Sequence, residues 1–268
     1  MKIDINYKTV YQFTSEVPRL VQQLKLFPTE CANQKIIDWS IKASEGKIID
    51  SHTDALGHRI FNIYLNNLTN SQEITAKGKI QTKNLHGVMK GLNEKVHPDC
   101  FLRQTVLTRP NKKIVQLVNN TESDSIVFCH KMNKAVAKSI KYLSGTTDVD
   151  TTAEKAITLG TGVCQDFAHI LIGLARHNNY PARYVNGFIA DNLEYGNNDT
   201  HAWVEIYIQD LGWVGFDPSH ETCIDEKYVR FGCGYDFANS SMIKGVKSNF
   251  KGNEILSKDI NIQLQGTQ

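Results

Sequence analysis

The chain has 268 residues, of which 30 are Lys or Arg and 28 are Asp or Glu, so its formal net charge is +2. A chain of this length can bury a sizeable core in one large domain or two small ones, and a hydrophobic content of 41% is that of a globular protein rather than a disordered one. The balanced charge, with no long run of one sign, argues against binding to nucleic acid or to a membrane surface.

The start of the chain shows no signal peptide. Residues 1–7 alternate between polar and apolar side chains, unlike the continuous apolar core of such a peptide. No apolar run in the sequence approaches the roughly 18 residues that span a bilayer. We therefore expect a soluble protein located in the cytoplasm.

Alternation of apolar and polar residues predicts a β-rich region over residues 1–85. Residues 3–7 and 74–81 alternate strictly, as half-buried strands do. Two further apolar runs lie between them, at residues 36–41 and 60–65. Several short strands separated by polar turns predict a small antiparallel sandwich.

The character of the sequence changes after this region. Two stretches between residues 86 and 107 are of mixed composition, and we expect them to be partly helical. Over residues 125–143, apolar residues recur at steps of three, four and seven, as on one face of a helix. We predict an N-terminal β-rich domain over residues 1–110 and a second domain over residues 111–268.

Cys164 falls at the start of a predicted helix. Gly160 and Gly162 end the preceding segment in a loop, and apolar residues then recur at helical spacing as far as Leu174. The positive end of a helix dipole and the free N–H groups of the first turn favour a thiolate at this position. The same N–H groups could bind an oxyanion formed on a carbonyl that the sulfur attacks. The alternative is that Cys164 is a small apolar residue packed at the end of a core helix.

Two downstream segments predict a β-hairpin. Residues 201–208 alternate in polarity, and residues 213–217 follow a turn at residues 209–212. His201 begins the first strand on its more polar face, and Asp217 ends the second strand just before a proline. A base oriented by a carboxylate on the neighbouring strand is the arrangement that a Cys-His-Asp triad requires.

The spacing of the hairpin does not by itself join the histidine to the aspartate. If Ile208 pairs with Trp213, Asp217 lies opposite Val204, about 10 Å along the strand from His201. A bulge or a different register must then close the gap. The alternative for Asp217 is a turn residue that ends its strand.

The cysteines do not indicate a metal site. They are scattered, with no Cys-x-x-Cys pair and no Cys and His at the spacing of a zinc site. Because no export signal is evident, we expect free thiols rather than disulfides. Apart from Cys164, we expect them to be small buried apolar residues. The six are Cys31, Cys100, Cys129, Cys164, Cys223 and Cys233.

Four ordered segments resemble the core of the bacterial transglutaminase-like superfamily, whose members include candidate cysteine proteases. They are GVCQDFAH at residues 162–169, PARYVNG at residues 181–187, HAWVE at residues 201–205 and GWVGFDP at residues 212–218. The resemblance extends over nearly the whole chain, and it includes the N-terminal β-region that precedes this core in the family.

The resemblance implies a fold, a site and a chemistry. The fold is α+β, with a papain-like core in which a cysteine-bearing helix packs on an antiparallel sheet, preceded by a β-sandwich-like N-terminal domain. The family's nucleophile maps to Cys164, its general base to His201 and its orienting acid to Asp217. The implied activity is thiol-dependent acyl transfer on a peptide or protein amide through a thioester, with no cofactor and no metal.

The sequence leaves three outcomes open. Water that resolves the thioester gives a peptidase or amidase, which we favour because no feature indicates a second amine site. An amine acceptor gives transglutaminase-type transfer, for which no loop carries the spaced carboxylates of a calcium site. A catalytically silent peptide-binding module is the third outcome, and the intact set of three residues argues against it. The oligomeric state does not follow from the sequence.

Overall fold

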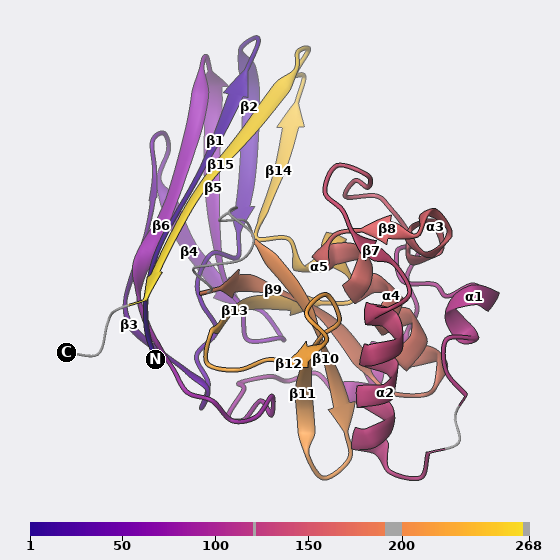
Figure 1. The fold of residues 1–268 in the computed structure, drawn as a ribbon. Coiled ribbons are helices and arrows are strands. Elements are labelled where there is room, and N and C mark those ends of the chain that lie inside the picture. The colour runs from indigo at the N-terminus through magenta and orange to yellow at the C-terminus, as the bar shows by residue number, and fades with distance from the viewer. Residues whose placement is uncertain (120–121, 191–199, 265–268) are drawn as a thin grey trace.

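Antiparallel strands begin and end the chain, and helices occupy its middle, in the computed structural model, which describes residues 1–119, 122–190 and 200–264 (Figure 1). Eight strands build two four-stranded sheets. They are β1 (Lys2–Phe13), β2 (Val17–Leu24), β3 (Gln34–Ala43), β4 (Ile48–Thr53), β5 (Arg59–Leu68), β6 (Ser71–Thr82), β14 (Ile243–Ser248) and β15 (Glu254–Leu264). The two sheets have the orders β15-β1-β6-β3 and β14-β2-β5-β4.

The alternating pattern of the first 85 residues produces these sheets. Ile3, Ile5 and Tyr7 of β1 are buried, and they lie beside Ile80 and Ala76 of β6 in the antiparallel ladder. Their polar neighbours lie on the opposite face, because successive side chains of a strand point to opposite sides. The predicted N-terminal β-sandwich is confirmed.

The last two strands complete the sandwich. The strand β15 pairs with β1 along its length, from Ile3 opposite Leu264 to Phe13 opposite Glu254, and β14 pairs with β2. Residues 243–264 therefore pack with the beginning of the chain. The division into two domains at residue 110 stays a prediction. The structure shows in addition that residues 243–264 return to the strands at the beginning of the chain.

A five-stranded antiparallel sheet forms the second half, in the order β12-β11-β10-β9-β13. Its strands are β9 (Ala182–Ile189), β10 (His201–Ile208), β11 (Gly212–Asp217), β12 (Thr222–Cys223) and β13 (Tyr228–Gly234). Short strands β7 (Lys141–Tyr142) and β8 (Thr161–Gly162) pair in parallel before the central helix. The helices are η1 (Pro98–Leu102), α1 (Lys112–Val115), α2 (Ser125–Ala137), α3 (Ala153–Leu159), α4 (Cys164–His177) and α5 (Phe237–Ser240).

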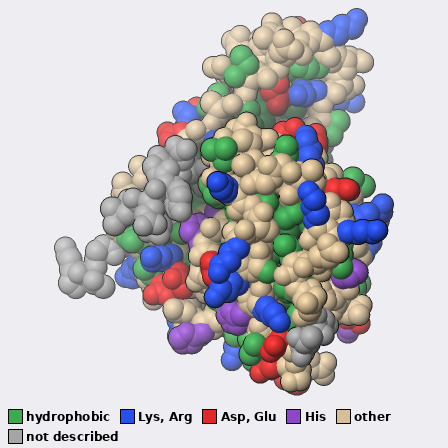
Figure 2. Space-filling model, turned by 45° about the vertical axis from the view of Figure 1, so that its right-hand side comes forward, with side chains coloured by type: hydrophobic (Ala, Val, Ile, Leu, Met, Phe, Trp, Pro, Cys, Tyr) green, Lys and Arg blue, Asp and Glu red, His purple; other side chains and the backbone are tan. Residues whose placement is uncertain are grey.

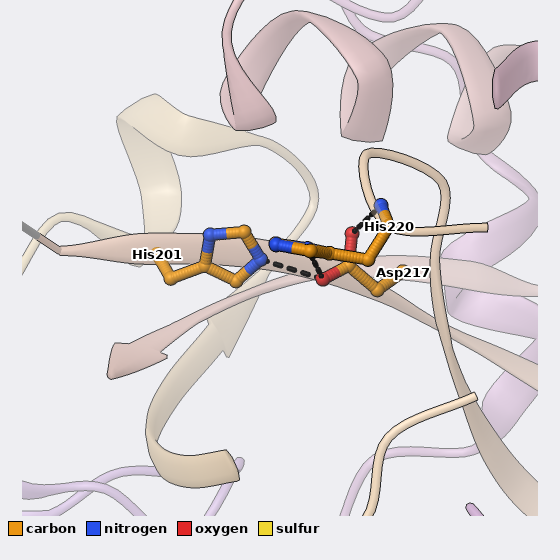
Figure 3. A group of neighbouring side chains, drawn as sticks. All are labelled: His201, Asp217 and His220. Carbon is orange, nitrogen blue, oxygen red and sulfur yellow. Dashed lines mark hydrogen bonds and ion pairs between the residues drawn. The ribbon is translucent and has the colours of Figure 1, made fainter. Parts of the chain in front are cut away.

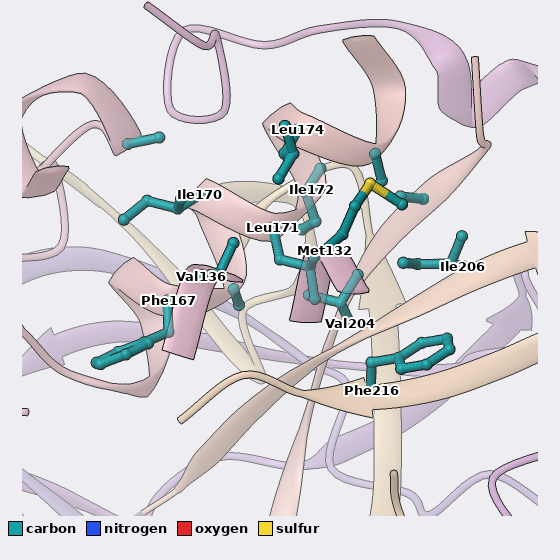
Figure 4. Packing of buried hydrophobic residues seen from close by; sticks show 14 of the residues in the cluster. Met132, Val136, Phe167, Ile170, Leu171, Ile172, Leu174, Val204, Ile206 and Phe216 are labelled. Atoms are coloured by element: carbon teal, nitrogen blue, oxygen red, sulfur yellow. The ribbon is translucent and has the colours of Figure 1, made fainter. Parts of the chain in front are cut away.

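Helix α4 is the central element of the helical layer. It packs against β9 and β10 on one side and against α1, α2 and α3 on the others. Leu171 and Ile172 of α4, Met132 of α2 and Val204 of β10 are fully buried in one cluster (Figure 4). The α+β fold with a cysteine-bearing helix on an antiparallel sheet is confirmed.

Two expected helical stretches differ from the structure. Between residues 86 and 107 the chain forms only the short 3₁₀ helix η1, and the stretch before it is irregular. Helix α2 ends at Ala137 rather than near residue 143, because Lys141 and Tyr142 form β7 and pair with β8. Tertiary pairing therefore overrides the apolar periodicity at that end.

The face of the core sheet away from the helices is buried as well. There Glu205 accepts hydrogen bonds from Arg183 Nε at 2.6 Å and from Arg230 Nε at 2.8 Å, and Arg183 also pairs with Glu94 at 2.8 Å. The Arg183 guanidinium lies 3.9 Å from the centre of the Trp213 ring. This ion network joins β9, β10 and β13, so the face expected to be more polar is in fact interior.

The surface agrees with the balanced composition. On the side shown in Figure 2, Lys and Arg side chains are spread among apolar and acidic side chains rather than gathered into one patch. Among the residues that the structure describes, no helix is long and apolar enough to cross a membrane.

Candidate active site

Cys164 is the first residue of α4 and is half-buried. Asp166 fixes this end of the helix, because its carboxylate accepts hydrogen bonds from the Val163 N–H at 2.8 Å and from the Thr147 hydroxyl at 2.7 Å. Gly162 leaves room for that carboxylate, since a Cβ at Gly162 would lie 2.7 Å from Asp166 Oδ2. The predicted placement of Cys164 at a helix start is confirmed.

His201 and Asp217 meet at the end of the hairpin (Figure 3). His201 Nε2 donates a hydrogen bond to Asp217 Oδ2 at 2.7 Å. Asp217 is fully buried, whereas 11% of the His201 side chain is exposed. Cys164 lies close enough to His201 for the negative charge of its thiolate to raise the pKa of the imidazole. The structure therefore brings together all three residues to which the sequence assigns catalytic roles.

The hairpin register differs by one residue from the expected one. Ile208 pairs with Gly212 and Val204 with Phe216, not Ile208 with Trp213. One step further along this ladder places Asp217 opposite Trp203. Residues 201 and 203 project from the same face of β10, so Asp217 and His201 are diagonal neighbours on one face and their side chains can span the gap. The register closes the expected gap without a bulge.

Burial and neighbouring charges shift the pKa of His201 in opposite directions. Burial lowers the pKa of a histidine, but the negative charges of Asp217 and of the Cys164 thiolate, together with the hydrogen bond to Asp217, raise the pKa of His201 from 6.5 to about 10. Burial would raise the pKa of Asp217, yet His201 and His220 hold it well below its ordinary value. The site therefore stabilises an imidazolium beside an ionised carboxylate.

Three residues that the sequence argument did not single out complete the surroundings of Asp217. Its Oδ1 accepts hydrogen bonds from the Ser219 N–H at 2.9 Å and hydroxyl at 2.6 Å, and its Oδ2 accepts from His220 Nδ1 and the Tyr228 hydroxyl, both at 2.8 Å. The Asp-Pro-Ser-His order could have indicated the first two, since an aspartate often accepts from the N–H groups two and three residues later. No local signal indicates Tyr228, which comes from β13.

Among the described residues, His201, Asp217 and His220 are the group whose side chains could together bind a metal ion. One donor atom from each of His201, Asp217 and His220 lies within 4.8 Å of the others, and two imidazoles with a carboxylate are ligands that zinc accepts. However, Asp217 Oδ2 already accepts a hydrogen bond from each imidazole. A cation would have to displace both protons, so the arrangement favours an ion pair.

The other cysteines only partly follow expectation. All six are free thiols, as predicted, and Cys129 and Cys233 are buried. Cys31 and Cys223 are half-buried, and Cys100 is exposed, so the expectation that the remaining five are all buried is wrong. Cys100 lies in η1, which runs over the surface and exposes its side chain.

Two family models match the chain. Residues 112–218 match the model of the transglutaminase-like superfamily, and residues 3–81 match the model of the bacterial transglutaminase-like N-terminal region. The first range contains Cys164, His201 and Asp217, and the second covers the strands β1 to β6 of the sandwich.

Similar proteins extend the comparison. The uncharacterised protein ML0607 of Mycobacterium leprae is 31% identical over 162 residues, which are 56% of each chain. The uncharacterised protein Rv2569c of Mycobacterium tuberculosis is 30% identical over 131 residues, which are 45% of this chain and 42% of that protein. The chain thus spans about half the length of the curated relatives it matches.

A solved structure shares the fold along the whole chain. It is that of a candidate cysteine protease from Cytophaga hutchinsonii, which is 21% identical, has a TM-score of 0.80, and is aligned over 100% of this chain and 92% of its own. With both family regions matched in order on the fold described above, the chain belongs to the transglutaminase-like superfamily and carries the bacterial N-terminal region ahead of its core.

Proposed function

We propose that the chain is a thiol-dependent acyl-transfer enzyme that hydrolyses peptide or protein amide bonds. Cys164 is the nucleophile, His201 the general acid and base, and Asp217 the residue that orients His201. The observation that carries this proposal is that His201 is hydrogen-bonded to the buried Asp217 and lies close enough to Cys164 for the charge of the thiolate to raise the pKa of His201. A nucleophile, a base and an orienting group linked in this order are what covalent catalysis by cysteine requires.

The reaction proceeds through a thioester. The Cys164 thiolate attacks the amide carbonyl, and the oxyanion accepts hydrogen bonds from the N–H groups of Cys164 and Gln165, since N–H groups of a helix's first turn lack acceptors inside the helix. The His201 imidazolium then gives its proton to the departing amine, and the C–N bond breaks. Neutral His201 next takes a proton from water, which attacks the thioester and releases the acid.

Hydrolysis is favoured over amine transfer because no feature of the sequence indicates a second amine site. The fold shared with a candidate cysteine protease from Cytophaga hutchinsonii agrees with this choice. The peptide or protein substrate and the cytoplasmic location remain part of the proposal.

The test is product analysis by mass spectrometry with a peptide library, with and without an added primary amine. We expect acid products whose formation requires Cys164, a thioester adduct on that residue after acid quenching, and no product in Cys164→Ala. Cys100→Ala is the matched control, and it should retain full activity. Amine adducts that form in preference to acids would replace hydrolysis by transglutaminase-type transfer.

Thiol reactivity separates an enzyme from a silent binding module. Cys100 is exposed and Cys164 only half-buried, so exposure alone would make Cys100 react first. Because Cys164 is paired with an imidazolium, we expect iodoacetamide to alkylate it faster than Cys100 near neutral pH. His201→Ala should abolish this preference. Equal or slower alkylation of Cys164 in the unmodified protein would favour the binding module.

A further inference from the structure

Two imidazoles share one oxygen of Asp217. His201 Nε2 lies 2.7 Å from Asp217 Oδ2, and His220 Nδ1 lies 2.8 Å from the same atom. Their ring centres are 5.2 Å apart and their planes are inclined to each other by 63° (Figure 3). Since a carboxylate only accepts, each imidazole donates an N–H to it.

The turn after β11 fixes His220 in this position. The His220 backbone N–H lies 3.3 Å from Asp217 Oδ1, so both its main chain and its ring donate to the same carboxylate. Ser219 donates twice to Oδ1 in the same turn. The His220 ring is 29% exposed, in contrast to the full burial of Asp217. His220 is therefore the most solvent-accessible of the side chains that hold this carboxylate.

The proposed reaction changes the charge beside Asp217. Before acyl transfer the carboxylate is paired with the His201 imidazolium, and after proton transfer to the leaving amine it lies beside a neutral imidazole. A buried ionised carboxylate that loses its counter-ion is strongly destabilised unless other donors remain. The His220 ring supplies such a donor at the same oxygen.

The shared oxygen also couples the two histidines. The His220 N–H points its positive end at Asp217 Oδ2, the atom that the protonated His201 also contacts. The two positive groups repel each other, so the His220 N–H disfavours the charged form of His201. Among the residues that the structure describes, the other groups that face His201 include Cys164 on α4, Tyr228 on β13, with ring centres 6.1 Å apart, and the Trp203 ring on β10. The Asp166 carboxylate, on the same helix as Cys164, is held by Val163 and Thr147.

We propose that His220 is a further positioning residue of this site, which keeps Asp217 ionised and in place while His201 is neutral and limits how tightly Asp217 holds the His201 proton. The inference rests on the proposed function, because it gives His220 a part in the proton transfer. His220 does not touch the reacting atoms and acts only through Asp217.

The experiment compares His220→Phe with His220→Asn. Phe retains a ring without a donor, whereas the Asn amide can place an N–H where His220 has Nδ1. In the Phe variant we expect kcat to fall about tenfold, the effect of losing one hydrogen bond to a charged group, with KM changed less than about twofold. The Asn variant should restore most of kcat. Circular dichroism and thermal melting show that both variants are folded.

The proton affinity of His201 distinguishes the proposed role of His220 from a merely structural one, because a structural role would leave this affinity unchanged. In the Phe variant the His201 titration followed by NMR should move to higher pH by about half a unit, which is about a threefold gain in proton affinity. The Asn variant should titrate like the unmodified protein. A folded Phe variant whose His201 titration is unmoved or lowered, or an Asn variant shifted as far as Phe, overturns the proposal.

The two proposals fail in different ways. If the unmodified protein neither alkylates selectively at Cys164 nor cleaves any peptide, the proposed function fails. The NMR titration of His201 in the Phe and Asn variants still reports whether His220 controls its proton affinity, because this measurement needs no substrate.

Discussion

Asp217 determines the protonation of its histidine neighbour more than any other residue of the site. Its charge and its 2.7 Å hydrogen bond offset the burial that would otherwise lower the pKa of His201. The side chain is fully buried, so no solvent can replace this interaction when it is lost.

We expect Asp217→Asn to lower both activity and the pKa of His201. With the charge of Asp217 removed, the pKa of His201 should fall from about 10, because burial then opposes the imidazolium with one fewer negative charge beside it. The value of kcat should fall by roughly 10²- to 10⁴-fold, as when the acidic member of a catalytic triad is neutralised. NMR titration and peptide cleavage measure the two effects.

Ser219→Ala is the control for that change. It removes one neutral donor to Asp217 Oδ1 and leaves the carboxylate and His201 in contact, so kcat should fall far less. An unchanged His201 titration in Asp217→Asn would show that the carboxylate does not set the proton affinity.

The site could be predicted from the sequence only where local patterns fix positions. Two glycines followed by helical periodicity place Cys164 at the start of α4, and this depends on nearby residues alone. The contact of His201 with Asp217 depends on hairpin register, and a shift of one residue changes the face from which a side chain projects. His220 was missed because its importance arises only from the shared oxygen.

Strands show a similar contrast at the level of whole elements. The strands β1 and β6 have one buried face, so their sequences alternate and could be predicted. All seven residues of β13 and nearly all of β9 are buried, so neither shows a polar face from which a strand could be recognised. The strands β14 and β15 are mostly exposed, and only their partners at the other end of the chain identify them.

Loss of one member of the ion network that joins β9, β10 and β13 should destabilise the fold strongly, because it leaves buried charges without a partner. We expect Glu205→Gln to lower the free energy of unfolding by about 3–5 kcal/mol, because two buried arginines would lose a shared counter-ion. Urea denaturation measures the loss. The control is Glu73→Gln, which breaks an exposed pair with Lys8 at 2.7 Å and should cost at most about 1 kcal/mol. Equal effects of the two changes would contradict a buried network.

His169 and His201 make the stability of the whole molecule depend on pH in opposite directions. His169 is fully buried, accepts a hydrogen bond from the Phe237 N–H at 3.2 Å, and burial lowers its pKa from 6.5 to about 4. Its contribution to stability is present above pH 6.5 and is lost as the pH falls towards 4. The raised pKa of His201 contributes fully below pH 6.5, and this stability is lost as the pH rises towards 10.

We therefore expect these two groups to place the highest stability near pH 6.5. Urea midpoints measured at pH 5, 6.5 and 9 should fall on both sides of the middle value. His169→Gln should flatten the acid side and His201→Gln the alkaline side. A midpoint that rises steadily from pH 6.5 to 9 in the unmodified protein would contradict the assigned charge of His201.

The return of β15 to β1 has a consequence for synthesis on the ribosome. The strand β15, which pairs with one edge of β1, is translated only after the whole helical half that separates the two strands. Until then that edge of the nascent sheet presents unsatisfied backbone groups, which are a template for pairing with other chains. Emergence of β15, rather than emergence of the first eighty residues, should set the moment at which this edge is paired and can no longer bind another chain.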